Sequence, residues 1–294
     1  MAEITMINLE MKIFDTHAHL FFGNFDDDVE ETVERCQKGG VKAQIQIGCD
    51  EVSSMAALNM AKKFPNFYAS IGVHPSDVLT CWDKPRRFKG LENYEIQAKN
   101  LDEFFVWAAK ITEDYKDKIV GFGETGFDLY HDDSPEIFEE QKKAFAGHLE
   151  LAKKFDKVLI IHNRDAADET LNFLRKNVKR GDVRGVIHCF CEGPEFAKEI
   201  IEDFGFYIGI GGVATYKNAQ NVRDAIAAVP LEYIVTETDA PFLTPFNFRK
   251  KFSRNEPTFL SEVIELIAEI KDIPVEECAE VLFENAKRLF QIKT

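Results

Sequence analysis

Short hydrophobic runs alternate with longer amphipathic stretches along this chain. The runs are rich in β-branched and aromatic residues and are bounded by Gly, Pro or Asp, which is typical of buried strands. They predict strands near residues 12–17, 43–49, 67–73, 119–124, 158–162, 184–188, 206–210 and 233–238. The stretches between them predict amphipathic helices near 27–38, 52–64, 100–116, 135–155, 166–178, 194–204, 218–228, 257–271 and 275–290. Strand and helix therefore alternate from one end to the other.

The number of strand–helix units separates two α/β folds. Eight units without a Pro-, Gly- or Ser-rich linker favour one closed (β/α)₈ TIM barrel of parallel strands, covering residues 1–294, over two domains. The alternative is an open, doubly wound sheet, which would carry a glycine-rich phosphate loop after the first strand. That position holds His17-Ala18-His19 instead. We therefore expect a barrel with its functional site at the carboxyl ends of the strands.

Polar residues stand where the predicted strands end. They are His17, His19, His74, Glu124, His162, His188 and Asp239. His17 and His19 are two residues apart on a strand and so face the same way. The other two histidines, His131 and His148, fall in a loop and a helix. Converging imidazoles and carboxylates are costly to bury without cations, so the pattern predicts a metal centre at the barrel mouth.

Composition supports a globular protein and narrows its location. Apolar residues make up 45% of the chain and include 26 phenylalanines, enough for a large core. The start lacks a signal-peptide pattern, and no run of eighteen apolar residues predicts a membrane span. Six scattered cysteines without a CxxC pair are typical of reduced thiols, so we expect a cytoplasmic or nuclear protein. Cys189 and Cys191 follow His188 closely and are read as loop or core thiols, with metal ligation as the alternative.

The charge balance argues against binding of bulk nucleic acid. There are 36 basic and 51 acidic residues, a net charge of −15, and an acidic surface repels a polyanion. Arg249, Lys250, Lys251 and Arg254 form a local exception just after the last predicted strand. They form either a solvated basic loop or a set of phosphate contacts.

Seven short motifs follow one another in order along nearly the whole chain. They are FDTHAHL (14–20), GVHP (72–75), GETGFD (123–128), IHNRDA (161–166), HCF (188–190), ETDAP (237–241) and RNEP (254–257). In this set the chain resembles the TatD family of metal-dependent deoxyribonucleases, among the amidohydrolase-like barrels. The resemblance implies a TIM barrel and metal-dependent hydrolysis of phosphodiester bonds in DNA, commonly from the 3′ end.

The same resemblance implies two divalent metal ions. His17, His19 and Asp239 would hold one metal together with Glu124, and Glu124 would bridge to a second metal held by His162 and His188. A carboxylate with two oxygens suits such a bridge, whereas relatives such as dihydroorotases use a modified lysine on this strand. The mixed ligands leave Zn, Mn, Mg, Fe and Co open.

Further roles are expected around this centre. Asp239 is the expected proton acceptor, and Glu124 shares the catalytic role through its bridging position. Arg164 is expected in the loop just after His162, where it would clamp a phosphate, with a salt bridge to Asp165 or Asp168 as the alternative. His74 and Arg254 are further candidates for substrate contact. Glu237 either orients a histidine ligand or is a buried structural carboxylate.

We expect DNA as the partner, as single strands or 3′ ends, with no membrane and no obligate protein partner. An amidohydrolase or esterase acting on a small carbonyl substrate is the first rival, because the same metals polarise C=O. A non-enzymatic protein that keeps the barrel is the second. Residues 76–100 look longer than the family's usual connection, which leaves a lid or an altered substrate range open.

Overall fold

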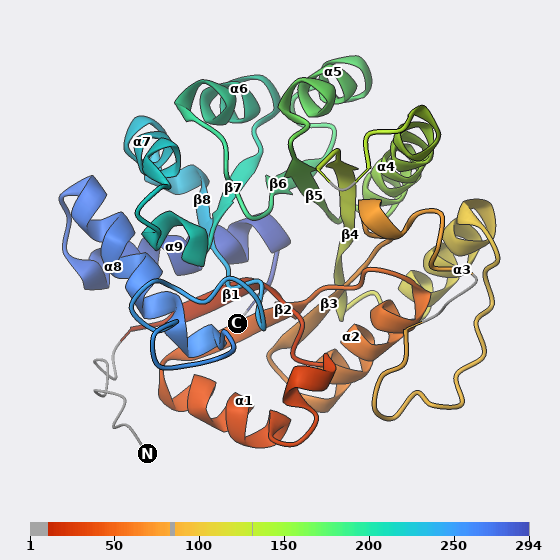
Figure 1. The fold of residues 1–294 in the computed structure, drawn as a ribbon, viewed down its shortest axis with the longest axis horizontal. Coiled ribbons are helices and arrows are strands. Elements are labelled where there is room, and N and C mark those ends of the chain that lie inside the picture. Colours follow the sequence, from red (N-terminus) through yellow and green to blue (C-terminus); the bar gives the residue numbers. More distant parts are fainter. Residues whose placement is uncertain (1–10, 83–85, 131, 294) are drawn as a thin grey trace.

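Eight parallel strands form the centre of the molecule and are ringed by helices (Figure 1). The computed structural model describes residues 11–82, 86–130 and 132–293. The strands follow sequence order around the sheet: β1 (Ile13–Ala18), β2 (Val41–Gln46), β3 (Phe67–Ile71), β4 (Ile119–Asp128), β5 (Val158–Arg164), β6 (Arg184–Ile187), β7 (Tyr207–Ile210) and β8 (Ile234–Thr236). Ala18 pairs with Ala240, and the Asp239 N–H donates to the His17 carbonyl at 2.8 Å. These bonds join β1 to the chain after β8 and confirm the expected TIM barrel.

Helices connect successive strands on the outside of the barrel (Figure 1). They are α1 (Val29–Lys38), α2 (Glu51–Lys63), α3 (Leu101–Asp114), α4 (Pro135–Phe155), α5 (Ala167–Asn177), α6 (Pro194–Phe204), α7 (Gln220–Ala228) and α8 (Leu260–Lys271), with α9 (Val275–Phe290) last. Local chemistry sets their ends. The Asp50 carboxylate accepts from the Ser53 N–H at 2.7 Å and begins α2, while Gly205, at φ 71°, ends α6.

Strands β4 and β5 extend further than expected, to Asp128 and Arg164. The sequence predicted that β4 ends at its glycines, because glycine commonly interrupts a strand. In the structure, Gly123 and Gly126 adopt φ of 126° and 139°, and the strand continues past an irregularity in its pairing with β5. Beyond it, Asp128 pairs with Arg164 across the two strands. Arg164 therefore ends β5 and does not lie in a loop, which corrects the expected position.

Helix α9 closes the end of the barrel opposite the functional residues. Phe14 of β1 packs inside the barrel, with ring centroids 6.0 Å from Phe283 and 6.4 Å from Phe290 of α9. The Asn285 amide donates to the carbonyl of Ile234 at 2.8 Å, which ties α9 to β8. The barrel is thus plugged at the amino ends of its strands, so a ligand site must lie at their carboxyl ends.

The described residues of segment 76–100 contact the barrel near the end of the segment. Glu51 of α2 accepts from the Tyr94 hydroxyl at 2.7 Å and from the Ala98 N–H at 2.8 Å. Nearer its start, Arg86 lines the cavity at the barrel mouth. The segment therefore contributes to the site, while its action as a lid stays a prediction.

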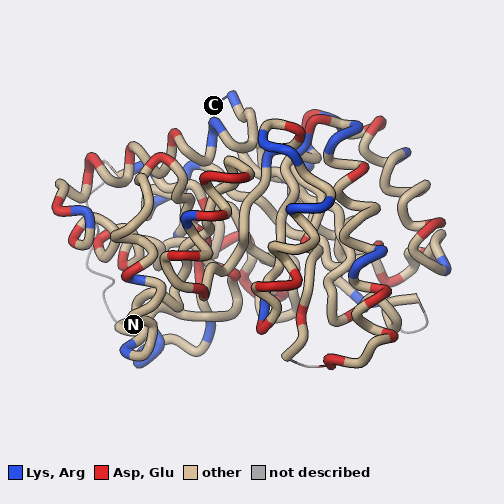
Figure 2. The backbone as a smooth tube through the Cα atoms, turned by 90° about the horizontal axis from the view of Figure 1, so that it is seen from above, with Lys and Arg blue, Asp and Glu red and all other residues tan. Residues whose placement is uncertain are grey.

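Surface charges are mixed over the outer helices. Figure 2 shows acidic and basic positions interspersed along the described backbone. All six cysteines are free thiols, as expected. Within the described ranges, no helix combines the length and apolar character that a membrane span needs.

Candidate metal centre

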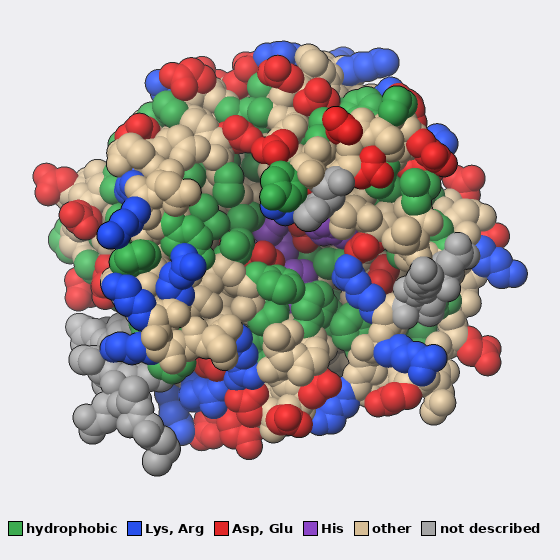
Figure 3. Space-filling model, viewed as in Figure 1, with side chains coloured by type: hydrophobic (Ala, Val, Ile, Leu, Met, Phe, Trp, Pro, Cys, Tyr) green, Lys and Arg blue, Asp and Glu red, His purple; other side chains and the backbone are tan. Residues whose placement is uncertain are grey.

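The expected strand-end residues meet in one hollow. A cavity of about 860 Å³ opens at the carboxyl ends of the strands. Its lining includes His19, His74, Glu124, His162, His188 and Asp239. Figure 3 shows histidine side chains at the bottom of this hollow. His17 is fully buried beneath it.

His17, His19 and Asp239 form one group of possible ligands. Asp239 Oδ1 lies 3.3 Å from His19 Nε2 and 3.7 Å from His17 Nε2. The His19 Nδ1–H donates to the Ile47 carbonyl at 2.9 Å, because a carbonyl only accepts. The His19 Nε2 lone pair therefore points to Asp239 and is available to a cation.

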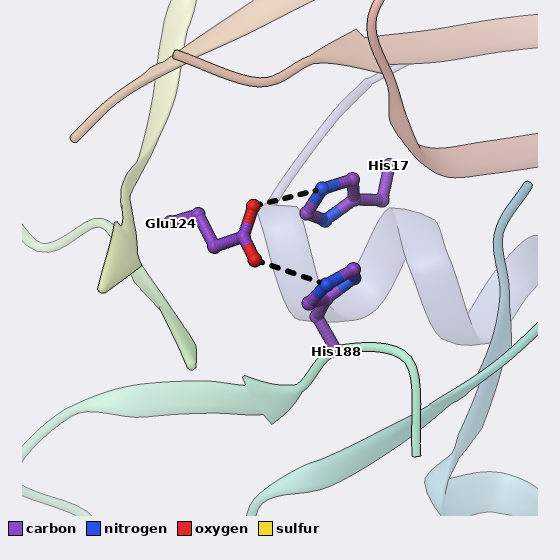
Figure 4. Close-up of side chains that lie close together, drawn as sticks. All are labelled: His17, Glu124 and His188. Atoms are coloured by element: carbon purple, nitrogen blue, oxygen red, sulfur yellow. Dashed lines mark ion pairs between the residues drawn. The ribbon is translucent and has the colours of Figure 1, made fainter. Parts of the chain in front are cut away.

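Glu124 stands between this group and a second one. Its Oε2 lies 3.4 Å from His17 Nε2, whereas its Oε1 lies 3.1 Å from His188 Nε2 and 2.6 Å from His162 Nδ1. Figure 4 shows the carboxylate turned with one oxygen to His17 and the other to His188. The two oxygens of one side chain thus face two different sets of histidines, which is the geometry a bridging carboxylate needs.

Glu237 fixes the orientation of His188. The His188 Nδ1–H donates to Glu237 Oε1 at 3.0 Å, and the Cys189 N–H donates to the same oxygen. This turns Nε2 of His188 toward Glu124. A carboxylate behind a ligand histidine is a common arrangement at metal sites. Of the two readings of Glu237, the structure favours the orienting role.

His74 differs from the other histidines of the hollow in its hydrogen bonding. Its Nδ1 accepts the Ser76 N–H at 3.1 Å, so its proton resides on Nε2. That nitrogen lies 3.4 Å from Glu124 Oε1. His74 is therefore arranged as a hydrogen-bond donor toward the cavity.

Burial and neighbouring charges set the protonation of the centre. Burial raises the pKa of Glu124, but the neighbouring imidazoles, above all His188, outweigh it and hold that pKa well below its usual value. Burial lowers the pKa of His188, yet Glu124 and Glu237 raise it well above its usual value, so a bound cation would have to displace a proton from its Nε2. Burial also raises the pKa of Asp239, but the imidazoles of His19, His188 and His17 outweigh it and bring that pKa below the usual range. The carboxylates are thus held ionised, as cation ligands must be.

The donor set fits divalent cations on two further counts. Ligand atoms about 2 Å from a shared cation lie about 3–3.5 Å apart, close to the spacings of 3.1–3.7 Å that link His17, His188, Glu124 and Asp239. Neither ring nitrogen of the buried His17 has a hydrogen-bond partner among the described residues. A buried, unpartnered imidazole is costly unless something else binds it, and a cation would do so.

Two carboxylates at the site, Asp15 and Asp128, were not predicted from the sequence to be functional residues. Asp15 is buried and accepts from the Thr238 hydroxyl at 2.6 Å and the His17 N–H at 3.2 Å, so it ties β1 to the segment before Asp239. Asp128 Oδ2 lies 3.2 Å from His162 Nε2. Asp15 precedes His17 by two residues, and Asp128 follows Glu124 by four. Residues an even number of positions apart on a strand face the same side, so these spacings could have placed both carboxylates at the site.

Arg164 reaches the cavity, but Arg254 does not. Arg164 lines the cavity, with its guanidinium 3.9 Å from the centroid of the Tyr130 ring. Arg254 turns to Asp28 at 2.6 Å and Glu256 at 2.9 Å. It is absent from the described lining residues, as is the run 249–251, so its substrate contact stays a prediction. Figure 3 shows Lys and Arg side chains beside the opening. His131 lies outside the described residues.

Comparison with known proteins agrees with this arrangement. The family model described as TatD related DNase matches residues 14–291. The uncharacterized metal-dependent hydrolase YabD of Bacillus subtilis (strain 168) is 35% identical over 280 residues, covering 95% of this chain and 99% of the relative. YcfH of Escherichia coli (strain K12), also described as an uncharacterized metal-dependent hydrolase, is 31% identical over 285 residues, covering 96% and 97%.

A solved structure extends the similarity to the whole fold. The crystal structure of YjjV, a TatD homolog from Escherichia coli K12, superposes with a TM-score of 0.79 at 28% identity, and covers 97% of this chain and 100% of its own. The matched family model spans the strand ends that carry the candidate ligands. The chain therefore belongs to the TatD related DNase family and is a metal-dependent hydrolase that acts on ester bonds.

Proposed function

We propose that this hydrolase is a deoxyribonuclease that cleaves phosphodiester bonds of DNA as a 3′–5′ exonuclease, using two divalent metal ions. His17, His19 and Asp239 hold one ion, His162 and His188 hold the other, and Glu124 bridges them. The observation that carries the proposal is the orientation of Glu124, whose Oε2 faces His17 at 3.4 Å while its Oε1 faces His188 at 3.1 Å. A family of deoxyribonucleases supplies the substrate class.

The residues of the cavity divide the work of hydrolysis. When bound, the cations supply an activated water and neutralise charge on the phosphoryl oxygens. Asp239 lines the cavity and accepts the proton of the attacking water. His74 donates through Nε2 to an oxygen in the cavity. Arg164 lies at the end of β5 and lines the cavity, and its guanidinium forms a bidentate pair with a phosphate of the substrate.

The charges of the cavity make the cations necessary for binding as well as for chemistry. The described lining residues include five carboxylates, Glu124, Asp128, Asp165, Glu192 and Asp239, but two guanidiniums, Arg86 and Arg164. Without cations, these groups repel a phosphodiester. With two divalent ions the same mouth attracts it. The acidic surface of the chain therefore does not exclude a DNA substrate.

Digestion of one single-stranded oligonucleotide, labelled either at the 3′ or at the 5′ end, tests the proposal. We expect cleavage that stops with chelator, returns on adding back Mn²⁺, Mg²⁺ or Zn²⁺, and removes the 3′ label first. Loss of the 5′ label first would contradict the polarity. The digest also includes RNA and duplex DNA.

The rival carbonyl hydrolase is tested with the same protein. Cyclic amides and lactones are offered under identical metal loading, because a dinuclear centre polarises C=O as well as P–O. We expect no turnover of these compounds at rates comparable with the oligonucleotide. Turnover of an amide or lactone without any cleavage of oligonucleotides would overturn the deoxyribonuclease assignment. A protein inactive toward all of them would favour the non-enzymatic rival.

A further inference from the structure

Two phenylalanine rings stand at the rim of the cavity beside two of the candidate metal ligands. The Phe22 ring is stacked on the His19 ring, with centroids 4.8 Å apart and planes at 21°. The Phe242 ring meets Phe22 edge-on, with centroids 6.0 Å apart. Both rings line the cavity. A continuous aromatic surface thus leads from His19 to the outside.

The exposure of Phe242 has no explanation in folding. Phe242 is 50% exposed, although burying a Phe side chain stabilises a folded protein. In the described part of the chain, the large hydrophobic residues that are exposed are Leu79, Val106, Tyr130 and Phe242. The two aromatic ones, Tyr130 and Phe242, both line the cavity. Exposed aromatic rings gathered at one hollow indicate a ligand surface.

The turn that carries Phe242 is held rigidly. The Phe242 N–H donates to the Asp239 carbonyl at 2.8 Å, and the Tyr216 hydroxyl donates to the Thr244 carbonyl at 3.0 Å. Gly212 lets the backbone approach closely, because a Cβ there would lie 2.0 Å from the Leu243 carbonyl oxygen. The backbone that carries the exposed ring is therefore held in one conformation. Less conformational entropy is then lost when a ligand binds.

The position of the rings relates them to the cleavage site. Phe22 follows β1 and Phe242 follows β8, whereas Tyr130 follows β4 and Arg164 ends β5. In a barrel with strands in sequence order, β1 and β8 lie across the mouth from β4 and β5. A chain that crosses the metal centre with a phosphate toward Arg164 therefore brings its neighbouring nucleotide to the phenylalanines.

We propose that Phe22 and Phe242 form a stacking subsite for the nucleobase next to the phosphate that is cleaved. The inference rests on the proposed deoxyribonuclease function and specifies how its substrate is held. Bases are planar and stack on aromatic rings whatever their identity. Phenylalanine offers no hydrogen-bond donor or acceptor, so the subsite recognises the presence of a base and not its sequence.

Abasic substrates test the subsite. The metal-loaded full chain is given a single-stranded oligonucleotide, or the same strand with abasic nucleotides at both ends, and kcat/KM is measured. We expect Phe242→Ala to lower kcat/KM about tenfold on the complete strand, the effect of losing one stacked base. On the abasic strand the parent shows a similar loss, and Phe242→Ala adds none. Phe242→Tyr keeps an aromatic ring and should lose less than Phe242→Ala on the complete strand. Val106→Ala, an exposed apolar residue that does not line the cavity, serves as the control.

A binding measurement separates failure of the subsite from failure of the function. Fluorescence anisotropy gives Kd for phosphorothioate versions of both strands. Cleavage with equal loss in Phe242→Ala on both strands, or with no loss on either, overturns the subsite alone. Base-dependent binding that Phe242→Ala weakens, without cleavage of any strand, overturns the function and supports the subsite. No binding of either strand overturns both.

Discussion

His188 lies with its Nδ1 3.0 Å from Oε1 of Glu237, on the side of the ring away from Glu124. The two residues follow β6 and β8, the strands on either side of β7. The contact fixes the orientation of the ring and keeps Nε2 directed into the cavity. Glu237 is thus a positioning residue, which acts through His188.

Weakening this contact should weaken metal binding without removing a ligand. We expect Glu237→Gln, which keeps the hydrogen bond but loses the charge, to lower metal affinity about tenfold, and Glu237→Ala to lower it by up to about a hundredfold. Competition with a chromophoric chelator measures both. Unchanged affinity in both folded variants would contradict the positioning role.

Glu124→Gln tests the bridge itself. An amide carries no charge and cannot join two cations with two equivalent oxygens, so we expect the bound metal to fall from two ions per chain to one or fewer. Cleavage should fall at least about a thousandfold, because the water is no longer activated between two charges. Elemental analysis and the oligonucleotide assay measure the two effects. A variant that retains two ions would refute the bridging assignment.

Removing the metal should weaken DNA binding as well as abolish cleavage. The cavity lining holds more carboxylates than guanidiniums, so a chelated protein presents a repulsive mouth. We expect the Kd for a phosphorothioate oligonucleotide to rise at least about tenfold on chelation and to recover on metal add-back. Fluorescence anisotropy measures it. Equal affinity with and without metal would place the binding surface elsewhere.

Arg254 and Arg35 offer a matched pair for separating stability from substrate contact. Both guanidiniums contact Asp28 and Glu256. We expect Arg254→Ala and Arg35→Ala each to lower the free energy of unfolding by about 1–2 kcal/mol, since each removes one of the two guanidiniums that pair with these part-buried carboxylates. Urea denaturation measures the loss. The substrate contact predicted from the sequence would appear as a rise in KM confined to Arg254→Ala.

His148 makes stability depend on pH. Burial of this α4 side chain lowers its pKa to about 4. The neutral ring accepts the Val73 N–H at Nε2 and donates from Nδ1 to the Ala144 carbonyl. The unfolded chain, with a pKa near 6.5, binds the proton more readily, so the contribution is complete above pH 6.5 and is lost as pH falls toward 4.

The size of this pH effect follows from the shift. We expect the free energy of unfolding to fall by about 2 kcal/mol more in the parent than in His148→Gln between pH 7 and pH 5. Urea denaturation at the two pH values measures the difference. Equal falls in the two proteins would show that His148 does not titrate as the structure indicates.

Most residues of the candidate metal centre could be predicted from the amino-acid sequence alone. Hydrophobic periodicity located the eight strands to within a few residues, because alternation with helices is a local property of the chain. The candidate ligands, such as His17, Glu124 and Asp239, were found because strand ends in a barrel converge, whatever the details of packing. The family motifs in the same segments agreed with this reading.

The sequence by itself determined the barrel and the set of residues around its mouth. Only the tertiary structure decided which nitrogen of each histidine faces the cavity, that β4 continues to Asp128, that Arg254 turns to Asp28, and that Phe242 remains in water. The physical reason is how far apart in the chain the interacting residues lie. Strand and helix periods follow from neighbouring residues, whereas tautomers, ion pairs and exposure depend on side chains that are distant in the chain and meet only when the barrel closes.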